Sequence, residues 1–320
     1  MTIINKAGRN SSYIKATNTK KVSTALESTK ALTYRNEKSL EAVHCQLEHY
    51  SPIKHPYFGY YTVNIFDCPN FTMFTNNDCP RAMDILFRRS FEPMSMRLWC
   101  KLAKHAGIAI DIGAHVGVYS LAAAALRSDL PVLAIEPNPD VFARLKVHCE
   151  LNKFKNINPI RLGIADRTTS TNLKWRKKPG GFLSSGSSFV VDVPNSKFVQ
   201  ETKVAVTTLD EITKNIQIKQ PVIIKIDVEG AEALVIKSMT RLLASRPDII
   251  IETFIDDKTN QISDILSKYN YSSFLIDEVN MRICKQKKLQ AVDPKGNSFN
   301  QLMTTQPKRI LGLFPEYNQD

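Results

Sequence analysis

Apolar residues recur along this chain in two alternating patterns. Between residues 108 and 252, short apolar runs recur, and apolar residues spaced three or four positions apart come between several of them. Runs of four to six apolar residues are typical of buried strands, and the three-to-four spacing is typical of helices. Strands separated by such helices predict right-handed crossovers and a mostly parallel sheet.

The pattern predicts one doubly wound α/β domain. Its predicted strands are Ile108–Ile112, Val132–Glu136, Asn158–Ala165, Val222–Ile226, Ile249–Glu252, Tyr271–Ile276 and Phe299–Thr304. Its predicted helices are Val118–Leu126, Asp140–Leu151, Ala231–Leu243 and Gln261–Tyr269. Pro139 suits the first turn of its helix, because proline lacks the N–H that this turn leaves unpaired.

The chain before residue 107 has a different character. Residues 1–40 are rich in Ser, Thr, Asn and Lys, so we expect a tail outside the fold. Residues 41–106 are expected to form a lead-in or lid segment, and residues 107–320 the main domain. Within the lead-in, Tyr60–Phe66 and Phe71–Phe74 favour two paired strands, and the spacing in Pro93–Ala106 predicts a helix.

Composition places the chain among ordinary globular proteins. It has 320 residues, of which 43% are hydrophobic and 23% charged, enough for a core without disulfide staples. No apolar run reaches the roughly 18 residues that a membrane span needs, and the first residues lack a secretory signal. We therefore expect a cytoplasmic protein. The 6 cysteines form no C-x-x-C pair, so we expect reduced core thiols and no metal site.

Positive charge is concentrated at the N-terminus. The net charge is +12, and residues 1–40 hold eight basic side chains against two acidic ones. A basic tail can touch nucleic acid or an anionic membrane. This one lacks interleaved aromatic residues and any nucleic-acid motif, which favours a solvated tail.

Asp111, Gly113 and Gly117 mark the turn after the first predicted strand. They form D-x-G-x-x-x-G, whereas nucleotide-binding turns carry G-x-G-x-x-G. Glycine permits a positive φ and a close approach of the backbone to a ligand. An ordinary strand-to-helix turn remains an alternative reading of this stretch alone.

Acidic residues end or follow the first five predicted strands. They are Asp111, Glu136, Asp166, Asp227 and Glu252. Ligands of open α/β sheets bind at the carboxyl ends of the strands. Carboxylates crowded at one edge repel one another, so the pattern indicates a ligand with cationic or hydroxyl groups.

Six segments in this order make the chain similar to a known family. They are Asp111–Gly117, Ile135–Pro139, Gly163–Asp166, Val206–Asp210, Lys225–Glu232 and Arg246–Glu252. Together they resemble the FkbM-type family of class I S-adenosylmethionine (AdoMet) methyltransferases. The resemblance implies a Rossmann-like sheet of seven mostly parallel strands, AdoMet as methyl donor, and O-methylation of a sugar, glycan or natural product.

The resemblance also suggests which residues hold the donor. Gly113 and Gly117 would let the first turn approach its methionine part, and Asp111 would take its ammonium directly or through water. Glu136 would accept both ribose hydroxyls through charge-assisted hydrogen bonds. Asp166 would accept from the adenine amine. Glu92, in Phe91-Glu92-Pro93, resembles a family lead-in that reaches the donor.

The acceptor side is expected near the fourth strand. Asp227 is our first choice for removing the acceptor's proton or positioning the acceptor. His115 is an alternative base because histidine titrates near neutrality. Glu229 and Glu252 are expected to line the acceptor site together with His115. The loop 176–188 can carry substrate contacts or serve only as a connection.

Three other functions stay open from the sequence. The first is a binding or scaffold protein on a degenerate methyltransferase fold. The second is a nicotinamide oxidoreductase, which the missing third glycine disfavours. The third is a nucleic-acid methyltransferase, although no N-P-P-[YF] signature is present.

Overall fold

A computed structural model describes most of the chain after residue 56. The described residues are 57–65, 67–88, 91–176, 183, 187–189, 199–253, 257–289 and 299–314. The expected basic tail 1–40 and the first part of the lead-in lie outside them.

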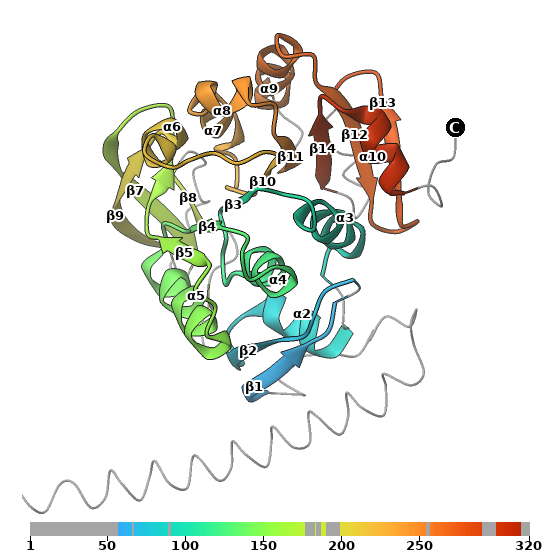
Figure 1. Ribbon diagram of the computed structural model, residues 1–320. Helices are drawn as coiled ribbons and strands as arrows, with labels where there is room; N and C mark the ends of the chain where they lie inside the picture. The colour runs from blue at the N-terminus through green and yellow to red at the C-terminus, as the bar shows by residue number, and fades with distance from the viewer. Residues whose placement is uncertain are drawn as a thin grey trace, which may run out of the picture.

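An eight-stranded mixed sheet forms the centre of the fold (Figure 1). In spatial order its strands are β13 (Arg282–Gln286), β12 (Ser272–Asp277), β14 (Asn300–Thr304), β11 (Asp248–Glu252), β10 (Val222–Ile226), β3 (Ile108–Ile112), β4 (Val132–Ile135) and β5 (Ile157–Ile160). Strands β5, β4, β3, β10 and β11 are mutually parallel, and β14 runs antiparallel between β11 and β12. The expected α/β class is confirmed, with β13 added as an eighth strand at one edge.

Both faces of this sheet are buried, which explains its nearly continuous apolar strands. All residues of β3 and β10 are buried. Successive side chains in a strand point to opposite faces. Accordingly Ala109 and Ile223 join the core on one face, whereas Ile110 and Ile224 join the core on the other.

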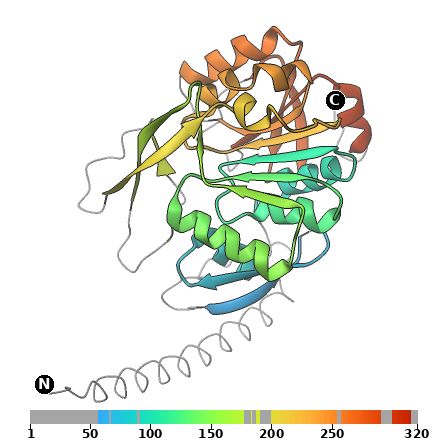
Figure 2. The same ribbon diagram turned by 60° about the vertical axis from the view of Figure 1, so that its left-hand side comes forward.

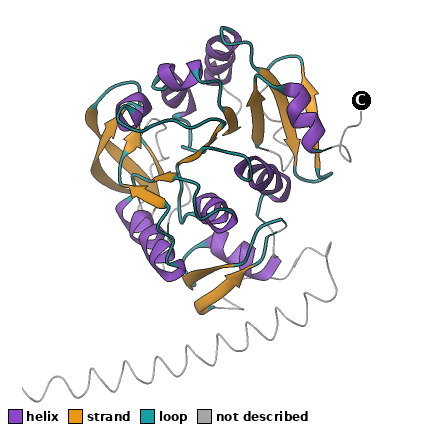
Figure 3. Ribbon diagram, in the orientation of Figure 1, coloured by secondary structure: helices purple, strands orange, loops and turns teal. Residues whose placement is uncertain are grey.

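Helices cover each face (Figure 3). One side carries α3 (Pro93–Ala103), α4 (Val118–Leu126) and α5 (Pro139–Asn152), and the other carries α6 (Leu209–Thr213), α7 (Glu232–Lys237), α8 (Thr240–Ala244) and α9 (Asp257–Ser267). The short α10 (Pro307–Leu313) packs Ile310 into the first of these cores. In the sheet, β4 lies on one side of β3 and β10 on the other, so the strand order reverses between β3 and β10. Open α/β sheets bind ligands beyond the carboxyl ends of the strands at such a point.

The lead-in packs against α4 and α5. Strands β1 (Phe58–Val63) and β2 (Phe71–Asn76) form an antiparallel hairpin, followed by α2 (Pro80–Arg88). Side chains of α5 satisfy backbone groups of β2: His148 Nε2 accepts from the Phe74 N–H at 3.0 Å, and Asn152 Oδ1 accepts from the Thr72 N–H at 2.7 Å. The predicted hairpin is therefore confirmed, with β1 starting two residues earlier than expected.

A second, four-stranded sheet corrects one prediction (Figure 2). It contains β6 (Gly163–Ile164), β9 (Val199–Thr207), β7 (Thr169–Arg176) and β8 (Ser187–Ser188). The single strand predicted over Asn158–Ala165 is wrong, because the chain leaves the central sheet after β5 and pairs Gly163 and Ile164 with β9 instead. Strands β7 and β9 are mostly polar and have at most three apolar residues in a row, so the hydrophobic pattern did not predict them.

The helix predicted over Ala231–Leu243 is also corrected. The structure breaks it into α7 and α8 around Ser238. The Ser238 hydroxyl donates to the Val235 carbonyl at 2.7 Å and accepts from the Leu209 N–H at 3.2 Å. Serine competes with the helix for backbone hydrogen bonds in this way, which explains the break.

Candidate active site

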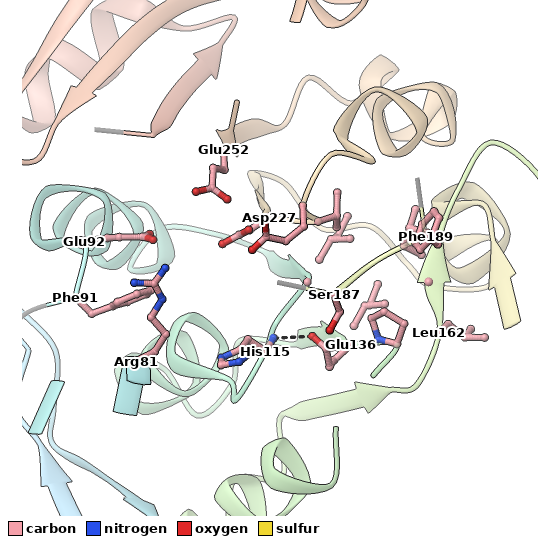
Figure 4. A pocket seen from close by; sticks show the side chains of 18 residues that line it. Arg81, Phe91, Glu92, His115, Glu136, Leu162, Ser187, Phe189, Asp227 and Glu252 are labelled. Atoms are coloured by element: carbon pink, nitrogen blue, oxygen red, sulfur yellow. Dashed lines mark hydrogen bonds between the residues drawn. The ribbon is translucent and has the colours of Figure 1, made fainter. Parts of the chain in front are cut away.

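A pocket opens at the carboxyl edge of the central sheet, where β3, β4, β10 and β11 end (Figure 4). Five carboxylate side chains line it, namely Glu92, Glu136, Asp227, Glu229 and Glu252. Its apolar lining includes Ile112, Ile135, Leu162, Ile164 and Phe189. Leu162 and Phe189 lie at one end of the view and Glu92 and Glu252 toward the other, so the pocket has an apolar end and an acidic end.

The turn after β3 brings backbone close to the pocket. Gly113 has φ +78°, and its N–H donates to the Ile135 carbonyl at 2.9 Å. A Cβ at this position would lie 1.7 Å from the Asp227 carbonyl oxygen. Only glycine fits here, because the positive φ and the crowding both exclude a side chain.

Glu136, directly after β4, is held from both sides. Its Oε2 accepts from the His115 N–H at 3.0 Å, and its Oε1 accepts from the Asn138 N–H at 2.8 Å. The residue is 6% exposed, and burial raises its pKa to about 7. A carboxylate fixed in this way keeps its remaining lone pairs for a ligand in the pocket.

Asp111 and Gly117 lie behind the pocket wall. The Asp111 carboxylate accepts from the Ser120 N–H at 3.1 Å and from the Ser120 hydroxyl at 2.6 Å, and burial raises its pKa to about 6. Gly117 has φ +94° and begins α4 as its N-cap. Neither residue lines the pocket. In the structure the Asp111 carboxylate anchors the start of α4 through Ser120. Its expected contact with the donor's ammonium, directly or through water, stays a prediction.

Asp166 also differs from its expected place. It follows β6 in the second sheet, its side chain is 37% exposed, and its carboxylate lies 3.7 Å from the Arg167 guanidinium. Gly163 and Ile164 line the pocket, but Asp166 does not. The chain leaves the central sheet before this residue, which moves its carboxylate away from the row of strand ends.

Asp227 directly follows β10 and lies close to a buried lysine. The Lys225 ammonium is 1% exposed, lies 3.7 Å from Asp227 Oδ2 and donates to Asn300 Oδ1 at 2.9 Å. The Asp227 side chain is 31% exposed and faces the pocket. Burial opposes its ionisation, but Lys225 and a hydrogen bond with Glu252 together hold the pKa of Asp227 below its usual value.

Glu252 and Glu92 complete the acidic end. Burial and the Asp227 charge raise the pKa of Glu252 well above its usual value, so this carboxyl holds its proton while Asp227 stays ionised. Glu92 Oε2 accepts from the Tyr119 hydroxyl at 2.6 Å and from Asn300 Nδ2 at 2.8 Å. Glu229, at φ +52°, has its pKa raised to about 7, mainly by burial.

The sequence did not point to the residues that support these acids. Lys225, Asn300 and Tyr119 come from β10, β14 and α4, and they meet beneath Asp227 and Glu92. A lysine inside the apolar strand Val222–Ile226 was the available signal, since a charged residue in a buried strand requires partners. No comparable sequence feature distinguished Asn300 and Tyr119.

The electrostatics of this pocket suit a cationic ligand. Among the described residues that line it, Arg81 is the one Lys or Arg against five carboxylates. Burial, and to a smaller degree the charge of Asp227, raises the pKa of both Glu136 and Glu229, so a nearby cation would favour their ionised forms.

The described part of the chain holds neither a membrane-spanning helix nor a cluster of metal ligands. No described helix is long and apolar enough to cross a membrane. No group of three or more His, Cys, Asp or Glu side chains in the described ranges is arranged to hold a metal ion. The described cysteines, Cys68, Cys79, Cys100, Cys149 and Cys284, are free thiols.

Strand order, the glycine turn after β3 and the acid after β4 define the class I fold of AdoMet-dependent methyltransferases. Residues 111–273 match the family model described as the methyltransferase FkbM domain, about half of the chain. The chain belongs to the FkbM methyltransferase family and is an AdoMet-dependent methyltransferase.

Similar proteins come from several organisms. The hexuronic acid methyltransferase AglP of Haloferax volcanii is 25% identical over 178 residues, which cover 56% of this chain and 69% of that protein. The structure of M. jannaschii TYW2 in complex with AdoMet is 12% identical with a TM-score of 0.37, covering 82% of this chain and 89% of that one. A precorrin-6y C5,15-methyltransferase from Geobacter metallireducens is 14% identical with a TM-score of 0.35, covering 67% and 87%.

Glu136 should make AdoMet binding depend on pH. Its raised pKa of about 7 means that the free protein holds a proton there at pH 6, and this proton must leave for the carboxylate to accept two hydroxyls. We expect the affinity measured by calorimetry to fall about tenfold from pH 8 to pH 6, following the ionised fraction. The pH dependence of folding stability has the opposite sign to that of AdoMet binding. The pKa of Glu136 is higher in the folded protein than in the unfolded chain. Its contribution to stability is therefore fully present below the unfolded pKa and is lost as the pH rises through 7.

Glu136→Gln is the control for this pH dependence. Glutamine keeps one acceptor oxygen but cannot titrate, so the variant should bind AdoMet more weakly at pH 8 and with a shallower slope toward pH 6. Glu229 has its pKa raised to a similar value and leaves some slope in place. An unchanged slope in Glu136→Gln would show that another group controls binding.

Proposed function

We propose that this enzyme transfers the methyl group of AdoMet to a hydroxyl oxygen of a sugar or glycan acceptor. The observation that carries the proposal is the Asp227 carboxylate, which follows β10, faces the pocket and stays ionised beside Lys225. A sugar hydroxyl is a weak nucleophile until its proton leaves, and a positioned carboxylate can accept that proton. The similarity to a hexuronic acid methyltransferase supports a sugar acceptor.

Asp227 would work through its contact with the acceptor. When bound, AdoMet supplies an electrophilic methyl group, whose bond to the positively charged sulfur breaks with the electron pair staying on sulfur. Asp227 would orient the acceptor hydroxyl by a hydrogen bond and take its proton as the oxygen–carbon bond forms. The neutral carboxyl would then return the proton to water. Glu252 would keep Asp227 in place through their shared hydrogen bond.

Other pocket residues would hold the donor. Glu136 would bind the ribose hydroxyls, and the Gly113 turn would lie beside the methionine part. Leu162, Ile164 and Phe189 would enclose the adenine ring by apolar contact. Glu92 would attract the ammonium group. In this proposal Asp111 and Gly117 hold the turn in shape from behind it.

The lead-in would belong to the same catalytic unit as residues 107–320. Phe91 and Glu92 line the pocket although they precede the central sheet in the chain. Glu278 fixes this segment, because its carboxylate accepts from the N–H groups of Met94 and Ser95 at 2.7 and 3.2 Å. Glu229, Glu252 and His115 would border the acceptor.

Isotopically labelled AdoMet tests the proposal. The enzyme is incubated with labelled donor and a panel of sugars and glycans, and mass spectrometry locates the transferred methyl group. We expect label on a hydroxyl oxygen as an ether, which survives alkali, whereas a methyl ester would not. AdoMet binding without transfer to any member of the panel would instead favour a binding protein on this fold.

A further inference from the structure

Arg81 brings a positive charge into a pocket lined by five acidic side chains. It lies in the first turn of α2, in the lead-in, and its exposed side chain lines the pocket. Figure 4 shows the guanidinium pointing into the space between Glu92, Asp227 and His115. Its Cζ lies 5.6 Å from the ring centroid of Phe91, a cation–π contact that holds the side chain toward the pocket.

The guanidinium of Arg81 makes no hydrogen bond or ion pair of ordinary length with the described residues. Five N–H donors in a rigid fork therefore remain for a ligand. This fork matches a carboxylate, which it binds by two parallel hydrogen bonds. These donors face solvent and carboxylates that lie beyond ion-pair distance.

The charge of Arg81 acts on the two carboxylates that border the acceptor in the proposed function. Its charge lowers the pKa of Asp227 and of Glu229, whereas it is not among the leading charges that act on Glu136. Asp227 and Glu229 border the acceptor in the proposed function, and Glu136 borders the donor's ribose. An acceptor carrying a negative charge would be repelled by Asp227 and the other ionised carboxylates of the pocket unless a cation received it.

We propose that Arg81 binds a carboxylate of the acceptor, so that the enzyme selects acidic sugars such as uronic acids over neutral ones. This inference rests on the proposed function and narrows its acceptor class. Arg81 would hold the carboxylate while Asp227 accepts the proton of a hydroxyl of the same sugar. The carboxylate of AdoMet's methionine part could bind Arg81 in the same way. The experiment below distinguishes it from a carboxylate of the acceptor.

The experiment compares two glycosides that differ in one group. 4-Nitrophenyl β-D-glucuronide and 4-nitrophenyl β-D-glucoside are titrated by calorimetry into the full-length protein saturated with S-adenosylhomocysteine. We expect the wild type to bind the glucuronide about tenfold or more tightly than the glucoside, the worth of one charge-assisted pair. Arg81→Gln should remove this preference, and Arg81→Lys should keep a part of it.

Arg167→Gln is the matched control, because the Arg167 side chain is 79% exposed and does not line the pocket. It should leave both affinities unchanged. AdoMet affinity, measured separately, should change less than about threefold in Arg81→Gln, below 1 kcal/mol. A large loss of AdoMet affinity in Arg81→Gln would assign the contact to the donor's carboxylate and overturn the proposal.

Two further outcomes would also overturn it. One is an equal affinity for both glycosides in the wild type, including no binding of either. The other is a preference that survives in Arg81→Gln. These results are distinct from a failure of the proposed function, which would show as absent methyl transfer while the glucuronide preference remains. Labelled methyl transfer to neutral and acidic sugars alike would support the proposed function and contradict the role of Arg81.

Discussion

Asp227→Asn should lower the rate of methyl transfer by about 10²- to 10⁴-fold, the usual contribution of a general base. Asparagine has the same shape but cannot take a proton. Affinity for AdoMet should change by only a few fold, because Glu136 and the Gly113 turn remain intact. Single-turnover transfer from labelled AdoMet to an acceptor identified by the panel measures the rate, and calorimetry measures the affinity.

Asp129→Asn serves as the control for this variant. The Asp129 side chain is 73% exposed and pairs with Arg127 beyond the end of α4, away from the pocket. It should transfer methyl groups at the wild-type rate. If Asp227→Asn also retained that rate, Asp227 would be a structural partner of Lys225, and the base would have to be sought elsewhere.

The acidic cluster around Lys225 also makes a compensating effect possible. Loss of the Asp227 charge removes a repulsion that raises the pKa of Glu252, so Glu252 should ionise more readily in Asp227→Asn. A residual rate that increases with pH in this variant would identify Glu252 as a substitute base. Removing Glu252 as well should then abolish the residual rate.

The sequence predicted the parts of this site that follow from strand direction. Glu136, Asp227 and Glu252 end or follow parallel strands that meet at one edge, so their position along the chain fixed their position in space. Gly113 was predictable for a related reason, since a strand-to-helix turn at a sheet edge needs backbone with a positive φ.

The sequence could not predict contacts that depend on packing between distant segments. Asp166 was expected at a strand end of the central sheet, but β6 pairs with β9, some forty residues later. Asp111 has the spacing of the D-x-G-x-x-x-G motif, but its carboxylate accepts hydrogen bonds from Ser120. Asn300 reaches Glu92 across 208 positions, and Arg81 enters the pocket from the lead-in. Residue spacing does not determine which of these side chains meet.

Gly113→Ala should be the most damaging single substitution for the fold. The new Cβ would lie 1.7 Å from the Asp227 carbonyl oxygen and 3.4 Å from Val228 Cγ1, so backbone must move. The Asp227 N–H donates to the Ile112 carbonyl at 3.0 Å, and any separation of the two turns weakens the end of the β3–β10 pairing. The positive φ adds about 1 kcal/mol for a residue with a side chain.

Together these effects should lower the free energy of unfolding by about 4 kcal/mol, at the upper end of single substitutions. For a domain of this size the Tm should fall by about 10 °C. Gly312→Ala is the matched control, because Gly312 lies in α10 and a Cβ there has no atom within 4 Å. Alanine at that helical position should stabilise the protein by about 0.5–1 kcal/mol. Urea unfolding of both variants measures the difference. A Gly113→Ala protein as stable as the wild type would contradict the tight contact between the turns after β3 and β10. The position of Asp227 depends on this contact.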